Sequence, residues 1–140
     1  MILSSLGTVI ATRELALGRR KKVIVRIGKA RKFRGSPDCY CPVQISGLGD
    51  DRIISVGGID AIQAFELALL HIGASLYYSD AAKAGKLSWD AGQAKGDLGF
   101  PVFEGSEDRL PKTLRQFYVR YPLPTPPKPR AKRRRAAKRG

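Results

Sequence analysis

The sequence predicts an α+β domain in which a four-stranded antiparallel meander is followed by one long helix. Apolar and polar residues alternate with period two between Leu6 and Val56, and turn residues interrupt this pattern. After Asp60 the apolar spacing changes to the 3.6-residue period of a helix. A short helix near Pro111 and a disordered basic tail complete the predicted order of elements.

The first two strands are expected to form a hairpin with one basic face. The first strand lies within residues 8–17, and the turn Gly18-Arg19-Arg20 leads into the second. Alternation divides the second strand into two faces, with Val23, Val25 and Ile27 on one side and Lys22, Ile24 and Arg26 on the other.

The third strand follows the turn at residues 35–38, and the fourth runs from Arg52 to Val56. Pro42 lies within the third strand, although proline cannot donate a hydrogen bond to a ladder. Regular pairing therefore starts after Pro42, or a bulge or edge position lies there. One face of this strand carries Cys39, Cys41, Val43 and Ile45.

The long helix is expected to begin at Ala61, because Asp60 and Gln63 form the two halves of a capping box. Its sheet-facing stripe consists of Ile62, Phe65, Leu69, Ile72 and Leu76, flanked by Ala61, Ala64 and Ala68. Leu67 and Leu70 lie off this stripe, so the second half of the chain or a second copy should cover them. With a second copy, Leu67 and Leu70 would form the interface of a homodimer; in the alternative interpretation they meet another protein.

Length and composition favour one domain over residues 1–121, followed by a proline-rich spacer and tail over residues 122–140. Residues 79–108 are rich in Gly, Ala and Asp and should wrap irregularly over this domain. The N-terminus has no export pattern, and the apolar run Leu67–Leu70 is far shorter than the ~20 residues of a membrane span. We expect a soluble cytoplasmic protein without membrane contact, with nucleoid association as one option.

The formal charge is +14, from 26 Lys and Arg against 12 Asp and Glu, and such an excess attracts polyanions. The end of the chain contributes a run of cations without an acid, which can bind phosphates by counterion release or bind an acidic protein. These tail residues are Lys128, Arg130, Lys132, Arg133, Arg134, Arg135, Lys138 and Arg139.

A second basic run, around the predicted hairpin, also contains an aromatic residue. It comprises Arg19, Arg20, Lys21, Lys22, Arg26, Lys29, Arg31, Lys32 and Arg34, together with Phe33. One interpretation is single-strand binding, with bases stacked on Phe33 and nearby Tyr40 while phosphates meet the cations. The other is a solvated hairpin with Phe33 buried in the core.

The segment from Gly58 to Leu69, with Gly-Ile-Asp-Ala-x-Gln-Ala at the helix start, resembles a family of small uncharacterised bacterial proteins. The likeness extends to Cys39-Tyr40-Cys41, to residues 45–49 and to Gly99-Phe100-Pro101. These motifs are turn glycines, a cap and core positions, so the resemblance implies a fold and no active site. The element order also resembles Whirly and Pur-type single-stranded DNA-binding domains, by analogy of topology alone.

No constellation of residues predicts catalysis, a metal or a cofactor. Cys39 and Cys41 with the single His71 do not make a zinc ligand set, and Asp60 occupies the amides that a phosphate would need after Gly57-Gly58. The sequence therefore predicts a protein that binds DNA or RNA with little sequence preference and is not an enzyme. The alternative is an accessory or inhibitory module that binds another protein.

Overall fold

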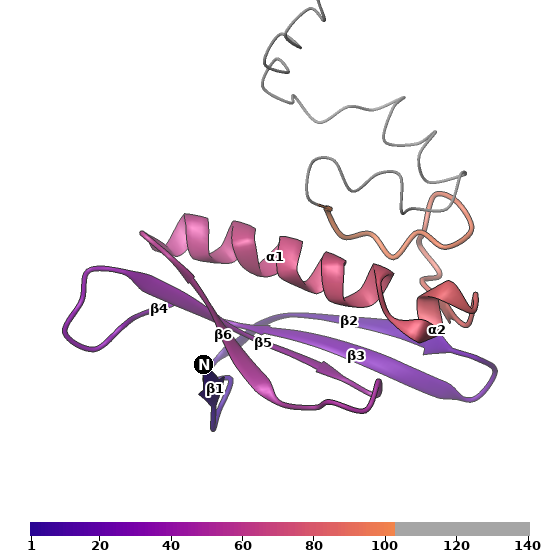
Figure 1. The fold of residues 1–140 in the computed structure, drawn as a ribbon, viewed down its shortest axis with the longest axis horizontal. Helices are drawn as coiled ribbons and strands as arrows, with labels where there is room; N and C mark the ends of the chain where they lie inside the picture. Colours follow the sequence, from indigo (N-terminus) through magenta and orange to yellow (C-terminus); the bar gives the residue numbers. More distant parts are fainter. Residues whose placement is uncertain (103–140) are drawn as a thin grey trace, which may run out of the picture.

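Within residues 1–102, which the computed structural model describes, seven strands form one sheet and a long helix covers one of its faces (Figure 1). Four strands are long: β2 (Val9–Leu17), β3 (Lys21–Gly28), β5 (Cys39–Ser46) and β6 (Ile53–Gly58). Three have two residues each: β1 (Ile2–Leu3), β4 (Arg31–Lys32) and β7 (Leu87–Ser88). The order across the antiparallel sheet is β1-β6-β5-β3-β2-β7, and β4 pairs with β5.

The prediction of a four-stranded sheet was wrong, whereas the α+β class is confirmed. β1 extends the sheet beyond β6, β7 extends it beyond β2, and β4 adds to the start of β5. A strand of two residues is too short to produce a period-two pattern, so alternation could not reveal these three. Their positions also depend on pairings distant in sequence, such as that of Ala16 with Ser88.

Pro42 lies inside the sheet at a break in one ladder. On one side of β5, pairing with β3 runs from Val43 to Ser46, and pairing with β4 covers Cys39 and Tyr40. Pro42 falls between these two sets of pairs, so pairing with β3 starts after it. A missing N–H is tolerated there because no residue of β3 or β4 is paired with Pro42.

The helix α1 (Ala61–Tyr77) begins where the sequence predicts. The Asp60 carboxylate accepts the Gln63 N–H at 2.8 Å, and the Gln63 side chain accepts the Ile59 N–H at 2.9 Å. The second bond involves Ile59 rather than Asp60, which differs by one residue from the usual capping box. A short helix, α2 (Asp80–Lys83), follows and is capped by Ser79.

The buried face of α1 is rotated from the predicted stripe. Its buried residues are Ala64, Ala68, Ile72, Gly73, Leu76 and Tyr77, whereas Phe65 and Leu69 are only partly buried. Ile62 is 73% exposed, so its assignment to the sheet-facing stripe was wrong. The small residues Ala64 and Ala68 allow the helix to approach the sheet closely, and this turns Ile62 to the side. Leu67 and Leu70 are half-buried.

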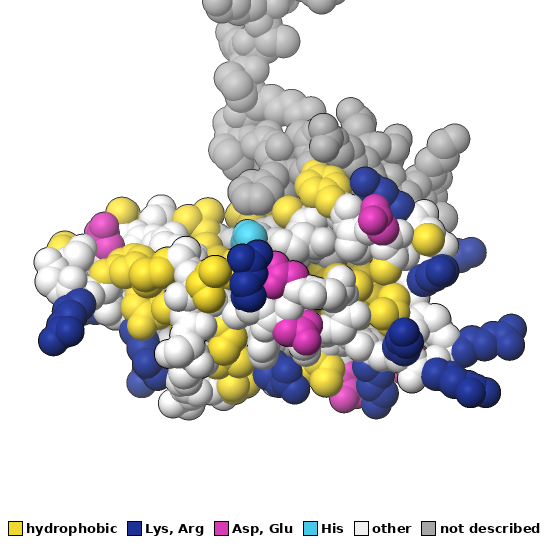
Figure 2. All heavy atoms as spheres, turned by 60° about the horizontal axis from the view of Figure 1, so that its bottom comes forward, with side chains coloured by type: hydrophobic (Ala, Val, Ile, Leu, Met, Phe, Trp, Pro, Cys, Tyr) yellow, Lys and Arg dark blue, Asp and Glu magenta, His cyan; other side chains and the backbone are white. Residues whose placement is uncertain are grey.

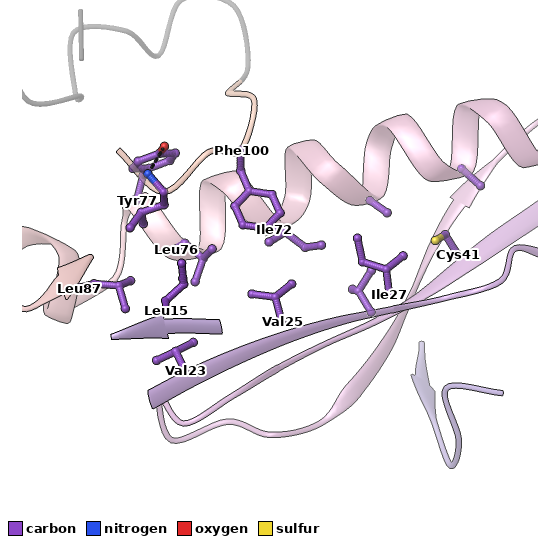
Figure 3. Close-up of a cluster of buried hydrophobic side chains, with 14 of the residues drawn as sticks. Leu15, Val23, Val25, Ile27, Cys41, Ile72, Leu76, Tyr77, Leu87 and Phe100 are labelled. Carbon is purple, nitrogen blue, oxygen red and sulfur yellow. Dashed lines mark hydrogen bonds between the residues drawn. The ribbon is translucent and has the colours of Figure 1, made fainter. Parts of the chain in front are cut away.

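The core lies between α1 and the sheet, and residues 89–102 close it at one end. Figure 3 shows Leu15, Val23 and Val25 pointing from the strands towards the helix, with Phe100 above them from the 89–102 segment. Gly73 permits this segment to pass close to the helix, because a Cβ there would overlap the Pro101 carbonyl. The predicted irregular wrap over residues 79–108 is therefore present from residue 89 to 102, whereas its first part contains the helix α2 and the strand β7 (Leu87–Ser88).

Polar groups fix the 89–102 segment to the rest of the domain. The buried Asp97 carboxylate accepts N–H groups of Gln93 and Gly99 at 2.8 Å each, and the Tyr77 hydroxyl accepts the Leu98 N–H at 3.0 Å. The Arg13 guanidinium stacks on the Trp89 ring, with its central carbon 3.8 Å from the ring centroid. Buried polar groups that are fully hydrogen-bonded add specificity to such a connection.

The predicted helix near Pro111, the spacer and the basic tail all lie outside the described residues. Among the helices that are described, none has the length and apolar character needed to cross a membrane.

Candidate nucleic-acid interface

The face of the sheet turned away from α1, here called the outer face, carries the polar side of the central strands. Residues of β3 alternate in burial, and Val23, Val25 and Ile27 are buried on the helix side. Lys22, Ile24 and Arg26 therefore lie on the outer face. The register places Thr12, Arg26, Gln44 and Ile53 in one row across four strands of this face.

The N-terminal segment crosses the outer face and divides it. β1 pairs with β6 at one edge, whereas β2 lies on the far side of β3, so residues 4–8 must pass over the strands between them. A Cβ at Gly28 would overlap the Leu6 carbonyl, and Pro42 beside it is fully buried. The Thr8 carbonyl accepts the Lys29 N–H at 2.8 Å and fixes the end of this crossing.

Basic residues form a cluster at the β2–β3 turn, here called the turn cluster. A surface hollow at this end is lined by Leu17, Gly18 and four cations. β7 brings Lys86 there, because its carbonyl accepts the Gly18 N–H at 2.8 Å. The turn cluster consists of Arg19, Arg20, Lys21, Lys22 and Lys86. Glu14 and Asp90 lie beside it and moderate its charge.

A second cluster lies at the opposite end of β3, where β4 and the following loop contain Arg31, Lys32 and Arg34. We call this group, with Phe33 and Tyr40, the loop cluster. The rings of Phe33 and Tyr40 lie 5.0 Å apart at 44°, and Phe33 also lies over Gly57. Both rings are half-buried and neither belongs to the core between the sheet and α1. Phe33 thus lies on the outer side of the sheet.

The basic run of the sequence is therefore divided between two ends of the sheet. β3 has eight residues, and at ~3.3 Å per residue this separates the clusters by about 25 Å. Arg26 lies between them and contacts Ser46 Oγ at 3.4 Å, while Lys29 lies exposed in the link from β3 to β4. Figure 2 shows Lys and Arg side chains at both ends of the molecule, where Figure 1 places the β2–β3 turn and the β4–β5 loop.

The sequence predictions for this surface missed Lys86, because the strand that positions it is too short to be recognised. The predicted tail cations, Lys128 to Arg139, lie outside the described residues. The predicted interface residues Leu67 and Leu70 lie on the helix, not on the outer face, and are not among the side chains packed on the core.

A pocket of about 240 Å³ lies on another side of the domain, between α1 and the β5–β6 loop. His71 and Ser75 line it, with His71 Nε2 3.4 Å from Ser75 Oγ, and burial lowers the pKa of His71. Asp50 also lines this pocket, but its carboxylate is engaged by Arg52 at 2.6 Å, which holds its pKa at about 2. The pocket thus brings together a histidine and a hydroxyl that the sequence did not connect.

The two cysteines are buried, as free thiols, on the helix side of β5. Burial raises the pKa of Cys41 to about 11, so its thiol is protonated at neutral pH and a poor metal ligand. In the described part of the chain, no three His, Cys, Asp or Glu residues cluster in a way that could hold a metal ion.

Comparison with known protein families gives a match. The sequence profile described as "Domain of unknown function (DUF6968)" matches residues 11–102. This range contains β2 to β7, both helices and the turn and loop clusters, and it ends with the 89–102 segment. No curated protein and no solved structure matches the chain.

Proposed function

The chain belongs to the DUF6968 family, a domain of unknown function, and we propose that it binds DNA or RNA with little sequence preference. The observation that supports this most is the shared outer position of three cations, Lys22, Arg26 and Arg31, and of the rings of Phe33 and Tyr40. Phosphates would contact the turn cluster, Arg26 and the loop cluster, and bases would stack at Phe33 and Tyr40.

The cations of this surface are available to a ligand. Lys22 has an acidic neighbour, Glu14, at 3.5 Å, but both side chains are more than half exposed, at 65% and 58%. Such an exposed pair contributes only about 0 to 1 kcal/mol, so a phosphate can replace Glu14 with little loss. Arg19, Arg20 and Lys21 are exposed at the turn.

The aromatic pair favours single strands over duplex. A base can stack on a ring only if it is free of its own stacked neighbours, as in a single strand. The N-terminal segment crosses the outer face beside Arg31, whose guanidinium lies against Gly7. This face therefore presents an uneven surface, and not a helix that could fill a groove of duplex DNA. Duplex would then be bound through phosphates alone, with lower affinity.

The tail adds a second, less specific contribution to this proposal. Its eight cations have no acid among them and would contact phosphates without a fixed geometry. The analogy with Whirly and Pur-type domains rested on four strands before one helix, and the seven-stranded sheet removes that premise. The proposal therefore depends on the surface of this chain alone.

Copurification from cells, with and without nuclease treatment, tests the proposal directly. We expect nucleic acid to elute with the untreated protein and to be absent when Lys22, Arg26 and Arg31 are replaced together by Gln in a chain lacking residues 128–140. The opposite result is an untreated sample without nucleic acid and a second protein that still copurifies in stoichiometric amount after nuclease treatment. It would favour the alternative of a protein-interaction module.

A further inference from the structure

Apolar side chains gather along one edge of the sheet, beside the N-terminal half of β2. Val9 and Ile10 are 43% and 53% exposed, and Ile62 of α1 is 73% exposed. A groove of about 120 Å³ runs between this strand and the helix, and its walls include Ala11, Phe65 and Leu69. We call Val9, Ile10, Ala11, Ile62, Phe65 and Leu69 the β2 patch.

The backbone of β2 is open on the same edge. Among the described residues, β7 pairs with β2 at Ala16 and Leu17 alone, so the strand from Val9 to Arg13 has a partner on its β3 side only. Gly18 donates its N–H towards β7, and N–H directions alternate along a strand. The N–H of Thr12 therefore points outward at the edge, where a further strand could accept it.

The β2 edge is only partly protected. A shift in the pairing register between Val9 and Ala11 marks a bulge, which is one feature that protects edge strands. Natural edges carry Lys or Pro, whereas residues 9–12 are Val, Ile, Ala and Thr. Arg13 is turned inward and donates to the Gly99 carbonyl at 2.9 Å, and Glu14 contacts Lys22. An uncharged partner strand at residues 9–12 would meet no charged side chain of this segment.

We propose that β2 of a second copy occupies this edge, in antiparallel pairing about a two-fold axis near Ala11. Such an interface is self-complementary, because each copy offers the same apolar strand and the same free backbone groups. The high positive charge of the chain opposes self-association elsewhere. The β2 patch has no charged residue, and Arg13, which lines the same groove, is turned to the Gly99 carbonyl. The two sheets then form one continuous sheet, and this interface does not depend on nucleic-acid binding.

Sedimentation velocity over a range of protein concentrations tests the dimer. We expect a wild-type dimer whose dissociation constant rises about tenfold or more in Ile10→Lys with Ile62→Glu, since both side chains are exposed in one copy and buried in two. Thr12→Pro should weaken the dimer as well, because it removes the outward N–H. Unchanged circular dichroism will establish that each variant is folded.

Two further variants separate this interface from others. Ile2→Glu is the matched control: Ile2 is 60% exposed and lies in β1, at the opposite end of the sheet from the β2 edge, so its dimer should match the wild type. Leu67→Glu with Leu70→Glu should also leave the dimer intact. The proposal is overturned by a wild-type monomer at every concentration, or by a dimer that dissociates with Leu67 and Leu70 rather than with the β2 patch.

Discussion

The aromatic rings of Phe33 and Tyr40 lie 5.0 Å apart on the outer side of the sheet, where Tyr40 is paired with Arg31 of β4. Aromatic pairs contribute to the stability of protein cores and interfaces. Here both rings keep part of their surface in solvent. Their position at the end of a basic strand suits contact with an unpaired base.

Removing these rings should weaken binding to single strands. Phe33→Ala or Tyr40→Ala is expected to cost about 1 to 3 kcal/mol on a single-stranded oligonucleotide and less on duplex, because only free bases stack. Tyr40→Phe keeps the ring and should bind like the wild type. Fluorescence anisotropy with matched single-stranded and duplex oligonucleotides measures the difference. An equal loss on both would indicate that the rings act through the fold alone.

Arg13 should matter for stability and not for binding. Its guanidinium stacks on Trp89 and Phe100 and donates to the carbonyls of Leu98 and Gly99. Arg13→Ala removes these interactions and should lower the free energy of unfolding by about 2 to 3 kcal/mol, with Arg13→Lys recovering part of it. Urea unfolding gives the change. Because Arg13 faces the helix side, the folded variant should bind nucleic acid with nearly the affinity of the wild type.

Neither thiol should react in the native protein at neutral pH. Both cysteines are buried, and the pKa of Cys41 is raised to about 11 by burial, so little thiolate forms. A chromogenic disulfide reagent should label both cysteines in denaturant and neither in buffer within the same time. Rapid labelling of the native protein would show that β5 opens readily or that the two thiols are accessible to solvent.

Stability should fall as the pH drops below the ordinary pKa of histidine, 6.5, because burial lowers the pKa of His71 in the folded chain. Between 6.5 and that lower value, the unfolded chain binds more protons than the folded chain, so acid favours unfolding. The contribution is complete above pH 6.5 and disappears as the pH falls. Thermal unfolding across this range should show the slope in the wild type and a weaker one in His71→Gln.

The sequence predicted the long elements because each carries a periodic pattern of its own. The alternation of Val23, Val25 and Ile27 and the cap at Asp60 depend on neighbouring residues, and both appear in the structure. The three short strands depend on pairings between distant segments. Ile62 has the spacing of a core residue, yet the contacts of Ala64 and Ala68 with the sheet decide how the helix is rotated.

The candidate surface was predictable in composition but not in arrangement. The basic run was visible as a sequence of cations, whereas its division into two clusters follows from the length of β3. Lys86 joins the turn cluster only through β7, and Phe33 lies outside the core because β4 pairs with β5. Such placements come from tertiary contacts, which residue spacing does not encode.

The salt dependence of binding tests nucleic-acid recognition most directly. We expect the logarithm of affinity for a single-stranded oligonucleotide to fall linearly with the logarithm of salt concentration. Each phosphate that a variant no longer neutralises should reduce the slope by about 0.7. Deleting residues 128–140 should flatten the slope for all sequences alike, and Lys22→Gln with Arg31→Gln should flatten it further. If the full chain binds neither DNA nor RNA at physiological salt, the account is contradicted and a protein partner takes the place of nucleic acid.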